Sequence, residues 1–251
     1  MPGAAEPADV LEARDLSRAF AGVQALDGVS LEVRPRRVVG LIGPNGAGKT
    51  TLINLLTGFD RPSSGAVRMG GRDITRWGPA KRSRHGLART FQHGHLFADL
   101  TVRENVEVAG LGAGLPPRAA RRRAAEVLGA LGLEGHADRA ARVLTHGLQR
   151  KLGVARAVAP RPHYVLMDEP AAGLVEAEVP DLAALVRSVA EDHGAGVLLV
   201  DHNMSLVLGV CDHVHVLDRG RTLAQGTPAQ IREDLDVTEA YLGGSGVGAH
   251  G

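Results

Sequence analysis

The stretch that decides the fold is residues 43–50, GPNGAGKT. It matches the phosphate-binding pattern G-x-x-x-x-G-K-[S/T] at every fixed position. The glycines leave backbone N–H groups free to wrap phosphates, the lysine reaches the outer phosphates, and the Thr50 hydroxyl suits Mg²⁺. The apolar run before it, residues 38–42, predicts a buried parallel strand. Residues 49–56 predict a helix that Gly58 terminates, with its positive N-terminal end directed at the bound anion.

A phosphate loop of this kind needs a carboxylate to complete the coordination of Mg²⁺. The apolar run HYVLMDE, residues 163–169, predicts a strand that ends at Asp168 and is followed by Glu169. Asp168 is therefore the candidate metal ligand, and Glu169 is the candidate base that polarises the attacking water. A further strand, VLLVDH, ends at His202, whose ring is a candidate sensor of the terminal phosphate.

The order of the predicted elements indicates the fold class. Residues 11–34 read as strands of an antiparallel layer, and residues 79–160 are dominated by helical patterning. From residue 163 onward strands and helices alternate, ending in a hairpin around DRGR, residues 218–221. This alternation predicts an α/β fold with a mostly parallel sheet. The Gly-rich end, residues 244–251, is expected to be a mobile tail.

Composition excludes several other classes of protein. The 251 residues carry 29 Lys or Arg against 28 Asp or Glu, a net charge of +1, and aromatic residues make up 3%. A nucleic-acid partner is therefore not expected. The single cysteine, Cys211, excludes a disulfide framework. No apolar run reaches the roughly 18 residues that a membrane-spanning helix needs, and we expect any membrane role to depend on partners.

The segment VLTHGLQRKLGVARAVAPRP, residues 143–162, resembles the signature segment of ABC ATPases, in which L-S-G-G-Q precedes an Arg- and Ala-rich helix. Phe20 lies where this family places the aromatic residue that stacks on adenine. Gln92 resembles the family's glutamine loop, and His202 its switch histidine. The resemblance implies a P-loop NTPase of ABC type with a RecA-like core, an N-terminal antiparallel β layer and a helical signature subdomain.

The resemblance also implies bounds and roles. A single ATPase domain is expected over residues 8–243, with the helical subdomain inserted at about 93–160. Glu169, His202 and Gln92 are the expected catalytic residues, and Thr50, Gln92 and Asp168 the expected contacts to Mg²⁺. The residues expected to bind ATP are Phe20, Gly43, Pro44, Asn45, Gly46, Ala47, Gly48, Lys49, Thr50, Thr51, Thr145 and Gly147. In this family two such subunits sandwich two ATP molecules, so Thr145 and Gly147 would face the partner's nucleotide.

A closer resemblance is to the ATP-binding subunits of branched-chain amino acid importers. It is carried by ARTFQHGHLFADLTVRENV at residues 88–106, DEPAAGL at 168–174, DRGRTLAQGTP at 218–228 and EAYLG at 239–243. It implies two membrane permease subunits, a second ATP-binding subunit, identical or paralogous, and an extracytoplasmic solute-binding protein as partners. The chain would then lie at the cytoplasmic face of the cell membrane. Leu96 and Phe97 would dock the permease.

Two positions depart from the family pattern. Leu148 stands where the signature usually has glutamine, and Val175 stands where Asp or Asn normally reaches across the dimer. These departures are either tolerated drift or, as we hypothesise, a weaker contribution to the partner's ATP site. Three alternatives stay open: the ATPase of an exporter, a soluble ABC-type ATPase acting on DNA, ribosomes or Fe–S assembly, and a partly degenerate regulatory ATP-binding subunit.

Overall fold

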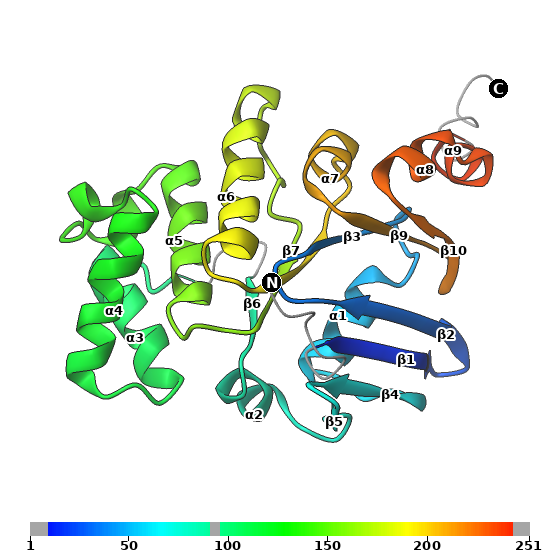
Figure 1. The fold of residues 1–251 in the computed structure, drawn as a ribbon, viewed down its shortest axis with the longest axis horizontal. Coiled ribbons are helices and arrows are strands. Elements are labelled where there is room, and N and C mark those ends of the chain that lie inside the picture. Colours follow the sequence, from blue (N-terminus) through cyan, green and yellow to red (C-terminus); the bar gives the residue numbers. More distant parts are fainter. Residues whose placement is uncertain (1–9, 91–95, 243–251) are drawn as a thin grey trace, which may run out of the picture.

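The computed structural model describes residues 10–90 and 96–242, with no side-chain detail for residues 241–242. Gln92 and the predicted tail at residues 244–251 lie outside the described residues. Within that part the strands form two sheets (Figure 1). The smaller, antiparallel sheet has the order β2 (Val23–Val33), β1 (Leu11–Phe20), β4 (Ser64–Met69), β5 (Arg72–Asp73). The larger sheet has the order β10 (Arg221–Gly226), β9 (His213–Asp218), β3 (Val38–Ile42), β8 (Gly196–Val200), β7 (Tyr164–Asp168), β6 (Leu87–Thr90).

The larger sheet is parallel from β9 to β6, and the β9–β10 hairpin adds its antiparallel edge. The predicted α/β fold with an N-terminal antiparallel layer is therefore confirmed. The helices are α1 (Lys49–Thr57), α2 (Pro79–Arg84), α3 (Val102–Gly112), α4 (Pro117–Ala130), α5 (His146–Val158), α6 (Val179–Glu191), α7 (Met204–Val210), α8 (Pro228–Glu233) and α9 (Leu235–Leu242).

Two apolar cores lie on opposite faces of the larger sheet. Along β3, Val38 and Ile42 join the core built with α3 to α7, whereas Val39 and Leu41 join the core built with α1 and the smaller sheet. This alternation is the two-residue period of a strand, and a strand buried on both faces reads as a continuous apolar run. Helix α1 lies between the two sheets in Figure 1, so the segment that precedes it is fixed from both sides.

The buried guanidinium of Arg82, on α2, stabilises the end of α1. It is 1% exposed and donates hydrogen bonds to the carbonyl oxygens of Leu55 and Leu56, both at 2.6 Å, and to those of Ile74, Thr75 and Trp77. The last carbonyls of a helix have no partner within the helix, and a planar five-donor fork satisfies several of them at once. Burial lowers the pKa of Arg82 to about 10. The sequence pattern did not predict this contact.

One strand of the larger sheet was also missed. The interval 79–160, predicted as helical, contains β6, which pairs in parallel with β7 from Leu87 to Thr90. Four residues beside helical segments are too short to show a strand's period.

Helices α3, α4 and α5 pack together at one end of the molecule (Figure 1). The predicted bounds of a helical subdomain at about 93–160, and of the whole domain at 8–243, stay predictions. On α4, Arg121 and Arg122 are exposed, as a solvated helix face requires, but Arg123 is not. Its guanidinium donates to the carbonyls of Val158 and Ala159 at the end of α5.

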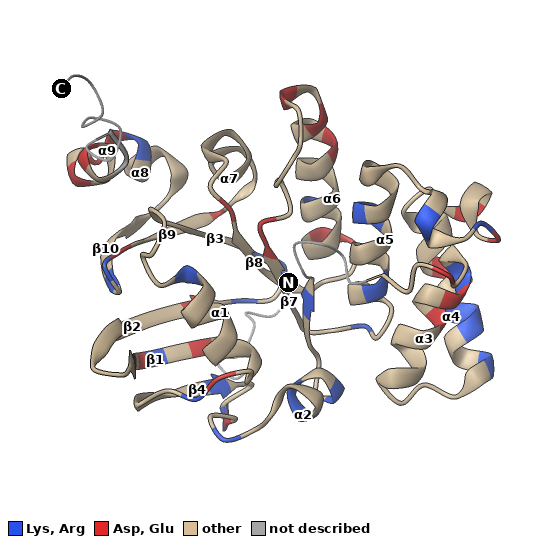
Figure 2. Ribbon diagram, turned by 180° about the vertical axis from the view of Figure 1, so that it is seen from behind, with Lys and Arg blue, Asp and Glu red and all other residues tan. Residues whose placement is uncertain are grey.

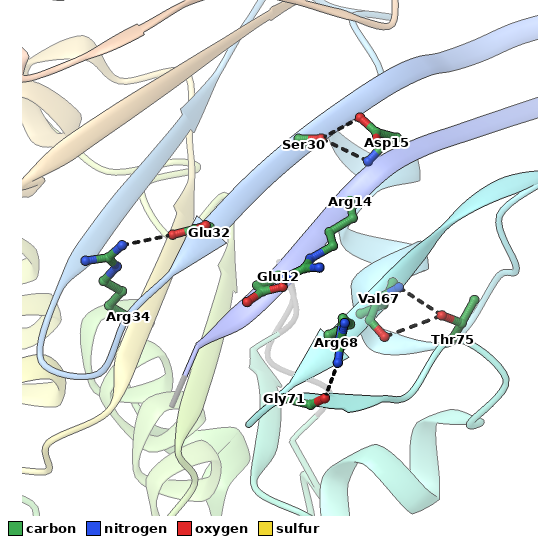
Figure 3. Close-up of polar contacts among 10 residues, drawn as sticks. All are labelled: Glu12, Arg14, Asp15, Ser30, Glu32, Arg34, Val67, Arg68, Gly71 and Thr75. Carbon is green, nitrogen blue, oxygen red and sulfur yellow. Dashed lines mark hydrogen bonds and ion pairs between the residues drawn. The ribbon is translucent and has the colours of Figure 1, made fainter. Parts of the chain in front are cut away.

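Charges of both signs are interspersed over the molecule. Figure 2 shows basic and acidic residues side by side on α4, where Arg122 and Arg123 each pair with Glu126. On the smaller sheet Glu12 and Glu32 lie directly opposite each other across β1 and β2. Like charges so placed repel, and each is offset by an arginine two residues further along the chain: Arg14 on β1, and Arg34 just after the end of β2 (Figure 3). Among the described residues, no helix is both long and apolar enough to span a bilayer.

His215 on β9 is expected to make folding sensitive to acid. It is 2% exposed, its Nε2 lies 2.8 Å from the Thr222 hydroxyl, and burial, aided by the nearby His213, lowers its pKa to about 4. The unfolded chain takes up this proton near pH 6.5, so stability is complete above 6.5 and falls as the pH drops toward 4. The loss is about 3 kcal/mol over that window. Urea unfolding of wild type and His215→Gln at pH 7.5 and 4.5 measures it, and an equal acid loss in both would contradict the assignment.

Candidate nucleotide-binding site

The candidate site lies where three neighbouring parallel strands end. In register, Leu41 of β3 lies opposite Val200 of β8, and Val200 lies opposite Asp168 of β7. The segment from Gly43, Glu169 and His202 therefore leave the sheet at one edge. Ligands of open α/β sheets bind outside the carboxyl ends of the strands. The sheet thus brings together the loop, the DE pair and the histidine that the sequence predicted separately.

Two glycines of the loop, Gly43 and Gly48, are required by close backbone approach. Gly48 caps α1 at φ 106°, and a Cβ there would lie 2.7 Å from the Ala25 carbonyl oxygen of β2. A Cβ on Gly43, at φ 153°, would lie 2.2 Å from the Leu217 carbonyl oxygen of β9. The loop is thus wedged between β2 and the β9–β10 hairpin. Because α1 begins at once, its first N–H groups form an anion site.

Lys49 is buried at 8% exposure, and its ammonium donates to the carbonyl oxygens of Gly43 at 2.6 Å and Pro44 at 2.9 Å. Burial lowers its pKa, while the charges of Glu169 and Asp168 act in the opposite direction. The ammonium therefore sits inside the loop, close to both acidic side chains, where phosphate oxygens would replace carbonyls as its acceptors.

The residues at this edge suit Mg²⁺. The Asp168 carboxylate pairs through Oδ2 with Arg89 at 2.7 Å, which leaves Oδ1 for a cation or its water. Thr50 adds a hydroxyl in the first turn of α1. Mg²⁺ is usually held by one or two protein oxygens together with substrate phosphates, and this donor set, all oxygen, fits that pattern.

Glu169 and His202 occupy adjacent strand ends. The Glu169 N–H donates to the Val200 carbonyl at 2.7 Å, and its backbone is left-handed, at φ 46°. Such a conformation is uncommon outside glycine and is found at functional sites. His202 is exposed, as a residue that meets a ligand must be.

Asp201, beside His202, is a residue that sequence reasoning missed. It is fully buried, and its two carboxylate oxygens accept hydrogen bonds from the N–H groups of Ala171 and Asn203, both at 2.9 Å. It therefore fixes the turn after Glu169 to the turn that carries His202. An aspartate at the end of a buried strand is the signal that could have identified it.

Phe20, the predicted adenine platform, ends β1 at the β1–β2 hairpin and is 44% exposed. The Arg18 guanidinium lies 4.4 Å from the ring centroid, and Asp60 holds it at 2.9 Å. One face of the ring is thus covered by a fixed cation. The hairpin abuts the phosphate loop through Ala25 and Gly48.

The signature residues lie apart from this loop. Thr145 caps α5, its hydroxyl accepting from the Leu148 N–H, and Gly147 lies near the Glu178 carboxylate. Figure 1 shows β6 and β7 between α5 and α1. This arrangement suits contact with another subunit's nucleotide, the role expected for Thr145 and Gly147.

The two departures from the family pattern differ in their surroundings. Leu148 packs against the core beneath α5, which accounts for an apolar side chain there. Val175 is 63% exposed. Its environment within one chain gives no reason for valine.

Comparison with known proteins places these features in a family. A family described as "ABC transporter" matches residues 26–172, and one described as "Branched-chain amino acid ATP-binding cassette transporter" matches residues 221–247. The branched-chain amino acid transport ATP-binding protein BraF of Pseudomonas aeruginosa is 43% identical, with 93% of this chain and 98% of that protein covered. The lipopolysaccharide export system ATP-binding protein LptB of Haemophilus influenzae is 33% identical, with 93% and 97% covered.

A solved structure agrees. The crystal structure of an ATP-binding cassette of an ABC transporter in its ADP conformation has a TM-score of 0.85 and 30% identity, with 94% of this chain and 99% of that chain covered. The family match spans the phosphate loop and the DE pair at the sheet edge, the two features that nucleotide hydrolysis needs. The chain therefore belongs to the ABC transporter family, as one of its ATP-binding proteins, and is an ATPase.

Proposed function

We propose that this chain powers the uptake of branched-chain amino acids or related small solutes. It acts at the cytoplasmic face of the cell membrane with two permease subunits, a second ATP-binding subunit, identical or paralogous, and an extracytoplasmic solute-binding protein. The observation that carries the proposal is the match of residues 221–247 to the branched-chain family, supported by the similarity to BraF over nearly all of that protein. Residues 221–247 lie outside residues 26–172, the segment that the general ABC transporter family matches.

Each site residue then has a distinct role in ATP hydrolysis. The N–H groups of residues 45–51 and the Lys49 ammonium hold the phosphates, with Phe20 under the base. Glu169 accepts a proton from the attacking water, whose oxygen bonds to the γ-phosphorus as the bond to the ADP oxygen breaks. His202 contacts the γ-phosphate. Thr50 and Asp168 would hold Mg²⁺, which would supply charge that neutralises the phosphates. Gln92 is proposed to join this set from the segment between β6 and α3.

A groove offers a docking surface for the permease. It has a volume of about 410 Å³ and lies between β6, α3 and α5, with Phe59, Arg89 and Arg156 in its lining. Phe97 is exposed nearby, with the Arg156 guanidinium 4.8 Å from its ring, whereas Leu96 packs against the core. Of the two residues predicted to dock the permease, Phe97 is therefore the one available to a partner.

Val175 is expected to limit hydrolysis at the partner's site. An exposed valine offers no hydrogen bond where Asp or Asn would reach across the dimer. Val175→Asn should therefore raise the ATPase rate of the assembled transporter, by about two- to tenfold for one hydrogen bond of about 0.5–1.5 kcal/mol. Leu235→Asn, a change at an exposed apolar residue of α9, is the control. A Val175→Asn rate equal to wild type would contradict the expectation.

Reconstitution in proteoliposomes tests the proposed function. The chain is combined with the permeases, second ATPase and binding protein encoded by neighbouring genes, and uptake of labelled leucine, isoleucine and valine is measured with and without ATP. ATP-dependent uptake in which the three solutes compete supports the proposal. Outward transport of lipid, as in the export system to which LptB belongs, or hydrolysis that no solute stimulates, would contradict it.

A further inference from the structure

We infer that Arg89 is a positioning residue that sets the spacing between the two proposed Mg²⁺ ligands, Asp168 and Thr50. Arg89 lies on β6, three residues before Gln92 and outside the loop, the DE pair and the signature. This role rests on the proposed assignment of Asp168 and Thr50 to the metal, and it adds a residue that holds those ligands without touching the metal itself.

The two ends of the guanidinium make two different contacts. Nη2 pairs with Asp168 Oδ2 at 2.7 Å, and Nη1 donates to the Asn54 side-chain oxygen at 2.8 Å. The pair is largely shielded from water, since the Arg89 and Asp168 side chains are only 10% and 16% exposed. Charge-assisted bonds to a planar fork are short and directional, so Arg89 fixes the rotation of the carboxylate as well as its place.

The Asn54 contact connects this carboxylate to α1. Asn54 lies four residues after Thr50 in α1, so the two side chains share one face of the helix. Arg89 therefore bridges the helix face that presents the Thr50 hydroxyl and the strand end that presents Asp168. A magnesium ion demands near-ideal octahedral geometry at about 2.0–2.1 Å, so a small change in the separation of its ligands costs affinity.

A lysine could not make the same bridge. Its ammonium is a single charged point, whereas the guanidinium presents nitrogens at both ends of a rigid plane. Arg89→Lys should keep a charge beside Asp168 but lose the simultaneous tie to Asn54. Asn54→Ala removes that tie from the other side without touching the Arg89–Asp168 pair. The two variants thus weaken one bridge from opposite ends.

The test measures nucleotide binding to the purified chain, using a fluorescent ATP analogue at a series of Mg²⁺ concentrations and in EDTA. Arg89→Gln should require about 10- to 100-fold more Mg²⁺ for half-maximal enhancement of binding, as is typical for loss of an outer residue that orients a metal ligand. Arg89→Lys and Asn54→Ala should fall between this variant and wild type. Binding in EDTA should stay within about twofold of wild type, since phosphate contacts do not depend on the bridge.

Arg123→Gln provides the matched control. Arg123 is also a half-buried arginine that donates to carbonyls, but at the end of α5 and away from the sheet edge. The inference is overturned if the Mg²⁺ requirement of Arg89→Gln equals that of wild type, if binding in EDTA falls as much as in Mg²⁺, or if Arg123→Gln shows the same shift. Should Arg89→Gln not fold, Asn54→Ala alone decides. No permease or solute enters this assay, so its failure is distinct from failure of the proposed importer.

Discussion

Glu169→Gln is expected to bind ATP as wild type does but to lose turnover by about 10²–10⁴-fold, the typical contribution of a general base. Glutamine keeps the size of the side chain and one hydrogen-bonding oxygen, but it cannot accept the proton of the attacking water. Glu169 is held for this role by the turn at the end of β7, with its N–H on Val200 and its backbone left-handed. A left-handed residue other than glycine is uncommon and is found at functional sites, which agrees with this role.

Phosphate release by the assembled transporter and binding of a fluorescent nucleotide separate the two effects. Glu191→Gln is the control, because the same change there falls at the exposed far end of α6. Turnover near wild type in Glu169→Gln would show that another group activates the water.

Lys49→Ala is expected to weaken nucleotide binding itself, by about 10- to 100-fold. The ammonium is already buried within the loop, so the charge that binds the phosphates is in place before the nucleotide arrives. Hydrogen bonds to charged groups contribute about 1.5–3 kcal/mol, which corresponds to this loss. Lys49→Arg should also bind poorly, because a guanidinium plane does not fit where a compact ammonium does.

Fluorescent-nucleotide titration measures this effect, and thermal unfolding checks that the variants fold. The chain has only two other lysines, and Lys81, exposed on α2 with its ammonium 4.2 Å from the Trp77 ring, supplies the control. If Lys49→Ala bound the nucleotide with unchanged affinity, residues 43–50 would not be the phosphate-binding loop.

The parts of the fold that could be predicted are those determined by neighbouring residues, through apolar runs and capping residues. Residues 38–42 are apolar at every non-glycine position because both faces of β3 are covered, and the helix from Lys49 to the left-handed Gly58 follows from capping chemistry. The sheet edge was predictable for a similar reason, since each candidate residue lies at the end of an apolar strand or within two residues of it. The short strand β6 was not predicted because four residues are too few to show the two-residue period of a strand.

The residues that were missed act through partners distant in sequence. In the sequence nothing distinguishes Arg82 from the other 25 arginines. Only the fold brings it to the carbonyl oxygen of Leu56, 26 positions earlier in the chain. Arg89 meets Asp168 from 79 positions away, and Asp201 reaches Ala171 across 30. Pattern reasoning sees residue type and spacing, whereas these roles depend on which strands become neighbours. For Leu148 the sequence suggested a weaker contact to the partner's ATP site, and the structure adds that this side chain packs against the core.

The most direct test of the central claim is the structure of Glu169→Gln with ATP and Mg²⁺ bound. The phosphates are expected on the N–H groups of residues 45–51, with the Lys49 ammonium moved from the Gly43 and Pro44 carbonyls to phosphate oxygens. The metal is expected at Thr50 and Asp168. Nucleotide bound elsewhere, or Lys49 still on its carbonyls with ATP present, would contradict the claim.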